Sequence, residues 1–202
     1  LGDVGKRATH QSARELAESK GNLISWVNCA GWTRGAPMHD FPNDPAVLEE
    51  LINANQVGSF WGCAEAVASF TTRKVPGAIV NISSVAGIRY LGKPQIAYSA
   101  AKAALQHYTK SSAVIMAPHK VRMNCVLPGL MMTPMVTRMA EKYAGGDLEG
   151  FIATRNGQVP MGVMGTAHDV ANAVLFLVAD ESHYITGTEI IVDGGVTATI
   201  PR

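Results

Sequence analysis

The chain has 202 residues, of which 47% are hydrophobic, and its 17 lysines and arginines against 16 aspartates and glutamates give a net charge of +1. This length supports one domain with a substantial core, and the composition is that of a soluble globular protein. Because the chain has no basic block and no apolar run long enough to span a bilayer, we expect neither nucleic acid nor a membrane as its partner.

Predicted helices and strands alternate along the whole chain. Helical patterns and their stop signals predict helices at residues 13–20, 46–69, 96–116, 133–144 and 166–179. Continuous apolar runs predict strands at residues 23–28, 77–83, 121–127 and 189–192. Such strands between helices are typical of a parallel sheet that is covered on both faces, so we expect a single α/β domain over residues 1–202.

The three cysteines, Cys29, Cys63 and Cys125, lack the spacing of metal ligands, and the six histidines are scattered. We therefore expect no metal site. An odd number of cysteines in apolar surroundings predicts buried, reduced thiols, as in a cytoplasmic protein.

Tyr98 and Lys102 are four residues apart in a predicted helix, so their side chains share one face. A phenol has a pKa of about 10, and a neighbouring ammonium group lowers that value. With a nearby hydroxyl, from Ser83 or Ser84, the pair could exchange a proton with an alcohol or ketone. Alone the pattern is weak, because a surface helix with a half-buried tyrosine and a solvated lysine has the same spacing.

Further motifs stand before and after this pair in a fixed order. They are Asp3-Val4, Val27-Asn28-Cys29-Ala30-Gly31, Asn55-Gln56-Val57-Gly58, Asn81-Ile82-Ser83-Ser84, Asn124-Cys125-Val126-Leu127-Pro128-Gly129 with Thr133, and Tyr184-Ile185-Thr186-Gly187 with Val192-Asp193-Gly194-Gly195. Together they resemble the classical short-chain dehydrogenase/reductase family over nearly the whole chain. The resemblance implies a Rossmann-like, doubly wound sheet and hydride transfer between NAD or NADP and a secondary alcohol or ketone.

The resemblance also implies a role for each catalytic residue. Tyr98 would donate and accept the proton, and Ser84 would hold the substrate oxygen. Lys102 would lower the pKa of Tyr98 and bind the nicotinamide ribose, and Asn55 would hold a water that relays protons. The residues expected to bind the cofactor are Asp3, Val4, Asn28, Ala30, Gly31, Tyr98, Lys102, Pro128, Gly129, Met131 and Thr133.

The chain departs from the family pattern at two places. Ser84 precedes Tyr98 by one residue more than is usual, so we expect an insertion within residues 87–95 and keep Ser83 as the second choice. The glycine-rich turn that opens the family fold is absent, so we expect an N-terminally truncated enzyme that lacks the first strands and the residues that distinguish NAD from NADP. The strand at residues 23–27 would then be an exposed edge that favours aggregation.

Residues 130–165 are expected to form the substrate loop or lid within the single domain. The segment contains Met131, Met132, Met135, Met139, Met161 and Met164. These residues would either fill gaps in the core or line a flexible lid over an apolar substrate.

By resemblance we also expect a cytoplasmic homotetramer or homodimer that acts on a small alcohol or ketone. A non-catalytic dinucleotide-binding or regulatory protein on the same fold is the alternative. A phosphate-loop nucleotidase is disfavoured, because no serine or threonine follows Lys6.

Overall fold

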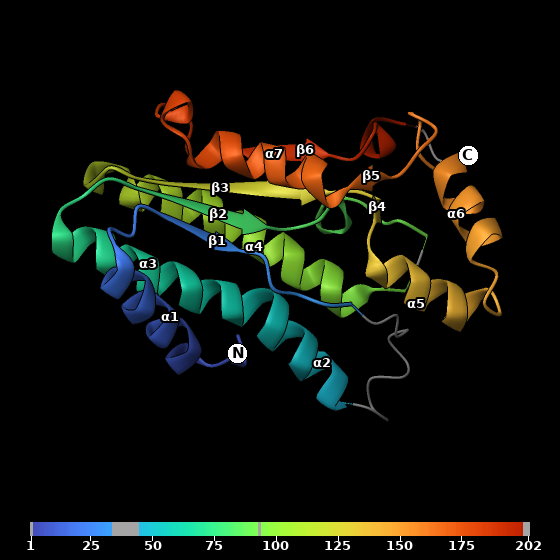
Figure 1. Cartoon of the computed structure of the whole chain (residues 1–202), viewed down its shortest axis with the longest axis horizontal. Coiled ribbons are helices and arrows are strands. Elements are labelled where there is room, and N and C mark those ends of the chain that lie inside the picture. The colour runs from blue at the N-terminus through green and yellow to red at the C-terminus, as the bar shows by residue number, and fades with distance from the viewer. Residues whose placement is uncertain (1, 34–44, 93, 200–202) are drawn as a thin grey trace.

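A parallel four-stranded sheet forms the centre of the computed structural model, which describes residues 2–33, 45–92 and 94–199 (Figure 1). Its strands lie in the order β1-β2-β3-β6 and comprise Ser25–Asn28, Gly77–Ile82, Val121–Pro128 and Glu189–Val192. Each strand pairs in parallel with its neighbour, so all four carboxyl ends meet at one edge. In the described part of the chain β1 pairs only with β2 and is an edge strand, as expected.

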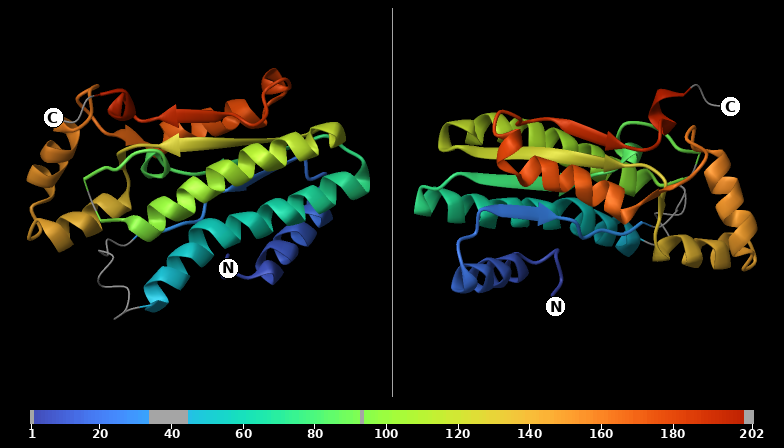
Figure 2. Two further views of the ribbon diagram at one scale, coloured as in Figure 1. Left: turned by 180° about the vertical axis from the view of Figure 1, so that it is seen from behind. Right: turned by 45° about the horizontal axis from the view of Figure 1, so that its top comes forward.

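Helices cover both faces of this sheet, which confirms the predicted doubly wound architecture. Helices α3 (Gly58–Arg73) and α4 (Ile96–Met116) pack on one face, and α7 (Ala167–Val178) packs on the other (Figure 2). Helix α1 (Arg7–Lys20) lies against α3, near the β1 edge of the sheet (Figure 1). No helix in the described segments combines the length and apolarity needed to cross a bilayer.

Two predicted segments have a different internal structure. The expected helix at residues 46–69 is α2 (Pro45–Ile52), one π-helical turn (Asn53–Val57) and then α3. After α5 (Pro134–Tyr143), a further helix, α6 (Leu148–Gly157), begins where the Asp147 side chain accepts a hydrogen bond from the Gly150 amide. This cap, a common helix start, was missed in the sequence.

Short elements complete the chain. They are the 3-10 turns Val85–Gly87, Ala117–His119, Asp180–Ser182 and Val196–Ala198, and the paired strands β4 (Met131–Met132) and β5 (Gly165–Thr166).

Phe70 is at the centre of the core between the sheet and helices α3 and α4. Its side chain is fully buried, and its ring lies directly over the backbone of Gly77, where an added Cβ would collide with it. The other buried members of this cluster are Cys63, Ala66, Ile79, Ala113, Val121 and Met123. The next residues along the strands, such as Val80, face the opposite way and pack with Leu177 of α7. This alternation shows that both faces of the sheet are buried.

A buried polar network joins the strands to the helices behind them. The Asn81 side-chain amide donates to Thr109 Oγ1 at 2.9 Å, and the Cys125 thiol donates to the same oxygen at 3.2 Å. Burial raises the pKa of Cys125 to about 11 and that of Cys63 to about 12. Both thiols are buried, as predicted. For Cys29 the prediction of a buried thiol is wrong, because this residue follows the end of β1 and is exposed.

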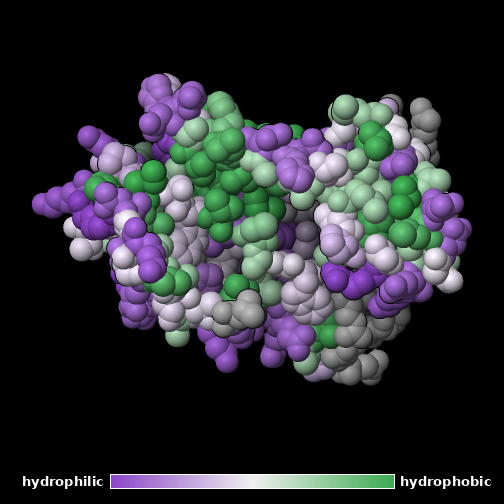
Figure 3. Space-filling view, in the orientation of Figure 1, coloured by the Kyte–Doolittle hydropathy of each residue, from purple (hydrophilic) through white to green (hydrophobic). Residues whose placement is uncertain are grey.

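Apolar side chains are exposed over α7 and beside β1, on the face shown in Figure 3. Leu175 and Ile24 are 65% and 64% exposed, and Phe176 and Val27 are also open to solvent. An unpaired edge strand beside such a surface favours association between chains.

A buried carboxylate fastens α1 to α3. Glu65 accepts hydrogen bonds from Arg7 Nε at 2.8 Å and from Arg14 Nε at 3.0 Å, and its side chain is 4% exposed. Burial acts to raise the pKa of Glu65, but the two guanidinium groups outweigh burial, so that the pKa is lowered. The ionised carboxylate is therefore the form that the folded protein stabilises.

The Glu65→Gln variant should lose about 1–3 kcal/mol of stability at pH 7, at the lower end because Arg7 is largely exposed. Because the pKa of Glu65 is lower in the folded protein than in the unfolded chain, the carboxylate stabilises the fold. This stabilisation is fully present above the pKa of the unfolded chain, about 4.3, and is lost as the pH falls through the pKa of the folded protein. The difference between variant and wild type should therefore shrink below about pH 4. Urea denaturation of the variant and the wild type, from neutral to acid pH, measures this difference. Glu50→Gln, at an exposed position, is the control. A difference independent of pH would contradict the assignment.

Candidate active site

The predicted site residues follow the carboxyl ends of the strands. Ala30 and Gly31 come just after β1, Ser84 just after β2, and Gly129 just after β3. Open parallel sheets bind their ligands outside this edge. The structure therefore gathers segments that are far apart in the sequence into one region (Figure 1).

Tyr98 and Lys102 lie one turn apart near the start of α4. The Lys102 ammonium is 5.6 Å from the centre of the Tyr98 ring, and it donates a hydrogen bond to the Ile82 carbonyl at 2.9 Å. The lysine side chain is buried, and burial lowers the pKa of Lys102 to about 8, although the nearby thiols of Cys29 and Cys125 oppose this change. The hydrogen bond to Ile82 thus fixes the Lys102 amine at the carboxyl end of β2, close to the Tyr98 ring.

Burial dominates the acidity of Tyr98. It raises the pKa of the phenol above its ordinary value, and a hydrogen bond with Ser84 acts in the opposite direction. The expectation that Lys102 lowers this pKa is wrong for the structure described here. The reason is that a buried phenol loses more by desolvation of its anion than it gains from its neighbours.

The two candidate serines have different partners. Ser83 Oγ donates to the Lys102 carbonyl at 3.0 Å and accepts from Gln106 Nε2 at 2.9 Å, so it is directed into the packing against α4. Ser84 Oγ accepts from the Ala86 amide at 3.1 Å, and the Ser84 side chain lies near enough to the Tyr98 phenol to oppose the rise of its pKa. Geometry therefore favours Ser84 as the hydroxyl beside the phenol.

Asn55 lies within the π-helical turn, an irregularity that is frequent at functional sites. Its Nδ2 donates to the carbonyls of Trp32 at 2.8 Å and Leu51 at 2.9 Å, whereas its buried Oδ1 has no hydrogen-bond partner. A Cβ at Gly31 would stand 2.6 Å from this oxygen and 3.4 Å from Lys102 Nζ. Gly31, Asn55 and Lys102 therefore meet around a polar atom that can still accept a hydrogen bond.

The predicted cofactor residues near the start of the chain form a turn before α1. The Asp3 carboxylate accepts from the Gly5 amide at 2.9 Å, and the Val4 carbonyl accepts from His10 Nε2 at 2.8 Å. Asp3 remains exposed, and the Val4 carbonyl lies against Gly58 at the start of α3.

The Asn28 side chain is buried inside the protein. Its Oδ1 accepts from Trp26 Nε1 at 2.8 Å, and its Nδ2 donates to Asn81 Oδ1 at 2.8 Å and to the Ser59 carbonyl at 3.2 Å. These contacts occupy the Asn28 side chain, and its expected place beside the cofactor stays a prediction. The side chain fixes the end of β1, from which the exposed Ala30 and Gly31 continue.

The segment after β3 packs closely on the end of β6. The Gly129 amide donates to the Val192 carbonyl at 2.8 Å, and a Cβ at Gly129 would stand 2.6 Å from the Asp193 Cβ. After Pro128, the last residue of β3, the chain continues through Gly129 to Met131 of β4. Thr133 then precedes the start of α5.

The expected lid segment continues through α5 and α6 and returns at β5. It has an apolar cluster whose members include Val136, Val159, Met164, Leu130, Leu148, Phe151 and Ile152. Met164 is buried in it, but Met161 is 76% exposed. The methionines thus divide between core and surface, and movement as a lid stays a prediction.

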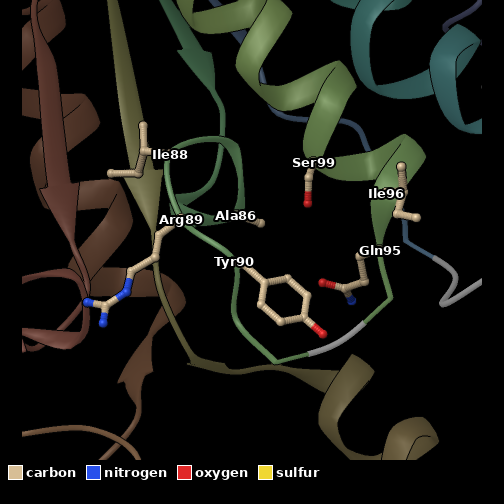
Figure 4. Close-up of a pocket in the computed structure, with 7 residues that line it drawn as sticks. All are labelled: Ala86, Ile88, Arg89, Tyr90, Gln95, Ile96 and Ser99. Atoms are coloured by element: carbon tan, nitrogen blue, oxygen red, sulfur yellow. The ribbon is translucent and has the colours of Figure 1, made fainter. Parts of the chain in front are cut away.

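A pocket of about 350 Å³ opens beside the start of α4 (Figure 4). It is lined by Ala86, Ile88 and Tyr90 from the segment after β2 and by Gln95, Ile96 and Ser99. The side chains of Tyr90 and Gln95 point toward each other, whereas Arg89 points away and donates to the Val196 and Thr197 carbonyls at 3.0 Å. Among the described lining residues, only the Arg89 guanidinium is charged.

These pocket residues were missed in the sequence. Their position between Ser84 and Tyr98 was the available signal, because a loop that joins two catalytic elements must border the site. The described residues contain no group of three or more side chains suited to hold a metal ion.

Comparisons with known proteins agree over most of the chain. A family model described as enoyl-(acyl carrier protein) reductase matches residues 2–197. A 3beta-hydroxysteroid dehydrogenase of Eggerthella lenta is 40% identical over 89% of this chain and 65% of its own length. A 2-(S)-hydroxypropyl-CoM dehydrogenase of Xanthobacter autotrophicus is 36% identical over 97% of this chain and 75% of its own length. The structure of an aldohexose dehydrogenase from Thermoplasma acidophilum superposes with a TM-score of 0.91 at 30% identity, over 99% of this chain and 78% of that one. The chain thus spans about two thirds to three quarters of the length of these proteins.

Proposed function

This chain belongs to the short-chain dehydrogenase/reductase family, and on that premise we propose that it transfers a hydride between NAD or NADP and a secondary alcohol or ketone. The observation that carries the proposal is that the Tyr98 phenol lies beside the Ser84 side chain and that the Lys102 amine is 5.6 Å from the centre of the Tyr98 ring. The relatives named above support it, because each is called a dehydrogenase.

The dinucleotide would supply or accept the hydride, and the chain would manage the proton. In ketone reduction, the hydroxyl groups of Ser84 and Tyr98 would hold the carbonyl oxygen and stabilise the charge that develops on it. Tyr98 would then donate its proton. Burial favours the neutral phenol, which is the form that can donate.

In alcohol oxidation, Tyr98 would have to lose its proton before it could act as a base. The Lys102 amine, with a pKa of about 8, is mainly a cation at neutral pH and would bind the nicotinamide ribose. The unpaired Oδ1 of Asn55 could hold a water beside Lys102, through which protons would exchange with solvent.

The residues at the strand ends suit a dinucleotide. Ala30 and Gly31 are exposed after β1, and the absence of a side chain at Gly31 leaves the approach to Asn55 and Lys102 open. Together with residues 128–133, these groups would hold the ribose and nicotinamide.

The pocket beside α4 favours a neutral, largely apolar substrate. Its aliphatic and aromatic lining would bury the carbon skeleton, and Gln95 could bind one polar substituent. Arg89 is occupied by two backbone carbonyls, so it is poorly placed to bind an anionic group. We further propose a cytoplasmic homodimer or homotetramer, in line with the expectation from the sequence.

A panel of secondary alcohols and ketones, assayed with both NAD(H) and NADP(H) on the native full-length protein, tests this function. We expect turnover of at least one apolar alcohol or ketone, read from the nicotinamide absorbance. Cofactor binding with no turnover across the panel would instead favour a non-catalytic dinucleotide-binding protein.

A further inference from the structure

Three hydrogen bonds fasten the segment after β2 to the catalytic helix. Ser83 Oγ donates to the Lys102 carbonyl at 3.0 Å. The side-chain amide of Gln106, one turn beyond Lys102, donates to Ser83 Oγ at 2.9 Å and to the Ser84 carbonyl at 3.1 Å. Each of the three bonds is made by the side chain of Ser83 or Gln106, and both side chains are buried.

Gly87 lets the same segment lie directly on α4. A Cβ at this position would collide with Gln106 Nε2 and would stand 2.9 Å from the Ala103 nitrogen and 3.0 Å from the Lys102 carbonyl carbon. The turn after Ser84 is therefore pressed onto the helix around the Gln106 amide.

We propose that Gln106 is a positioning residue, which fixes the Ser84 backbone so that the Ser84 hydroxyl meets Tyr98. The proposal rests on the function proposed above and concerns a residue that touches neither substrate nor cofactor. Through Ser83, the same amide is also linked to the Lys102 backbone, so a single side chain joins the segments that carry the serine, the tyrosine and the lysine.

The energetic argument depends on what happens when the amide is removed. Without Gln106 Nε2, the Ser84 carbonyl keeps its hydrogen bond from the Gly87 amide at 3.0 Å but loses its link to α4, and Ser83 Oγ loses a donor as well. Each lost hydrogen bond costs about 0.5–1.5 kcal/mol. The segment can relieve that cost by moving toward solvent, which would carry Ser84 away from the phenol. A displacement of about 1 Å at a reacting group can lower the rate by about 10²-fold.

Gln106→Met keeps the length of the side chain and removes both donors. In the native full-length protein we expect kcat to fall about 10–100-fold, with the KM for the cofactor unchanged. Thr109→Val is the matched control, because it removes a buried hydroxyl of α4 that is bonded to Asn81 but not to Ser84. That variant should lower the melting temperature and keep kcat.

A double variant separates positioning from general damage. If Gln106 acts through Ser84, then Gln106→Met combined with Ser84→Ala should be no slower than Ser84→Ala alone. If the reductions of kcat in the two single variants multiply in the double variant, the proposal is overturned. It is also overturned if Gln106→Met keeps the wild-type kcat while Ser84→Ala lowers it.

Titration of Tyr98 gives a readout that needs no turnover. Since the hydrogen bond with Ser84 lowers the pKa of the phenol, Gln106→Met should raise the Tyr98 pKa in the same direction as Ser84→Ala. NMR of ¹³Cζ-labelled tyrosine measures this, with Tyr98→Phe to assign the signal. An unchanged Tyr98 pKa would overturn the proposal even if no substrate is found.

A milder variant covers the case in which Gln106→Met does not fold. Ser83→Ala removes the two hydrogen bonds of Ser83 Oγ and leaves the bond from Gln106 to the Ser84 carbonyl, so kcat should fall by less than about 10-fold and the Tyr98 pKa should rise slightly. Failure of the proposed function is distinguishable, because Tyr98→Phe and Ser84→Ala would then both keep full turnover.

Discussion

Replacement of Tyr98 by phenylalanine should lower turnover by about 10²–10⁴-fold, the usual contribution of a general acid–base group. The variant removes one oxygen from a ring that lies beside Ser84 and Lys102, so the substrate oxygen would lose both its proton donor and one hydrogen bond. The ring itself remains, and the fold should be retained. Steady-state kinetics in both reaction directions, with circular dichroism as a check on folding, measure the effect.

Tyr108→Phe is the control for this variant. Tyr108 belongs to the same helix, and its ring stacks on Phe60 with the centroids 3.9 Å apart. Loss of its hydroxyl should leave turnover within about twofold of wild type, since the group lies away from the strand ends. Full activity of the Tyr98→Phe enzyme would refute the proton-transfer role.

The pH dependence of the wild-type enzyme should follow the raised pKa of Tyr98. Alcohol oxidation requires the deprotonated phenol, so its rate should still be rising with pH above neutrality. Ketone reduction requires the protonated phenol, so its rate should hold through neutral pH and fall only as the pH passes that pKa.

Phe70→Ala should lower the free energy of unfolding by about 3–5 kcal/mol. The ring is fully buried and rests on the backbone of Gly77, in the middle strand pair. Because hydrogen-bonded strands cannot move in to fill the space, most of the cavity should persist. The loss is a large part of a typical total of about 5–15 kcal/mol.

Urea denaturation of Phe70→Ala and of Phe176→Ala provides the comparison. Phe176 is 43% exposed on α7, so its truncation should cost much less. Turnover per folded molecule should change little in either variant, since neither ring belongs to the site. Equal losses in the two variants would show that the core around Phe70 collapses after truncation.

The sequence was sufficient to locate the four main strands, and the candidate site residues that it named follow the ends of three of them. Apolar runs such as Val121–Pro128 stand out because both faces of a parallel strand are buried, and their carboxyl ends must share one edge. The spacing of Tyr98 and Lys102 likewise follows from helical geometry alone.

Other features depend on tertiary structure and could not be predicted in the same way. The π-helical turn at Asn53–Val57 keeps a helical hydrophobic pattern, so periodicity does not reveal it. The choice between Ser83 and Ser84 depends on which side of the strand end meets α4. The direction of the Tyr98 pKa depends on burial, which no local spacing specifies.

The three thiols of the chain differ sharply in accessibility. Cys63 and Cys125 are shielded and hold their protons strongly, whereas Cys29 is open to solvent two residues before Gly31. Maleimide dyes react with accessible thiolates, so they should attach at Cys29 without any engineering of the chain. A fluorophore there would lie just after β1, beside the residues proposed to hold the dinucleotide, and its emission should change if the dinucleotide binds at that edge of the sheet.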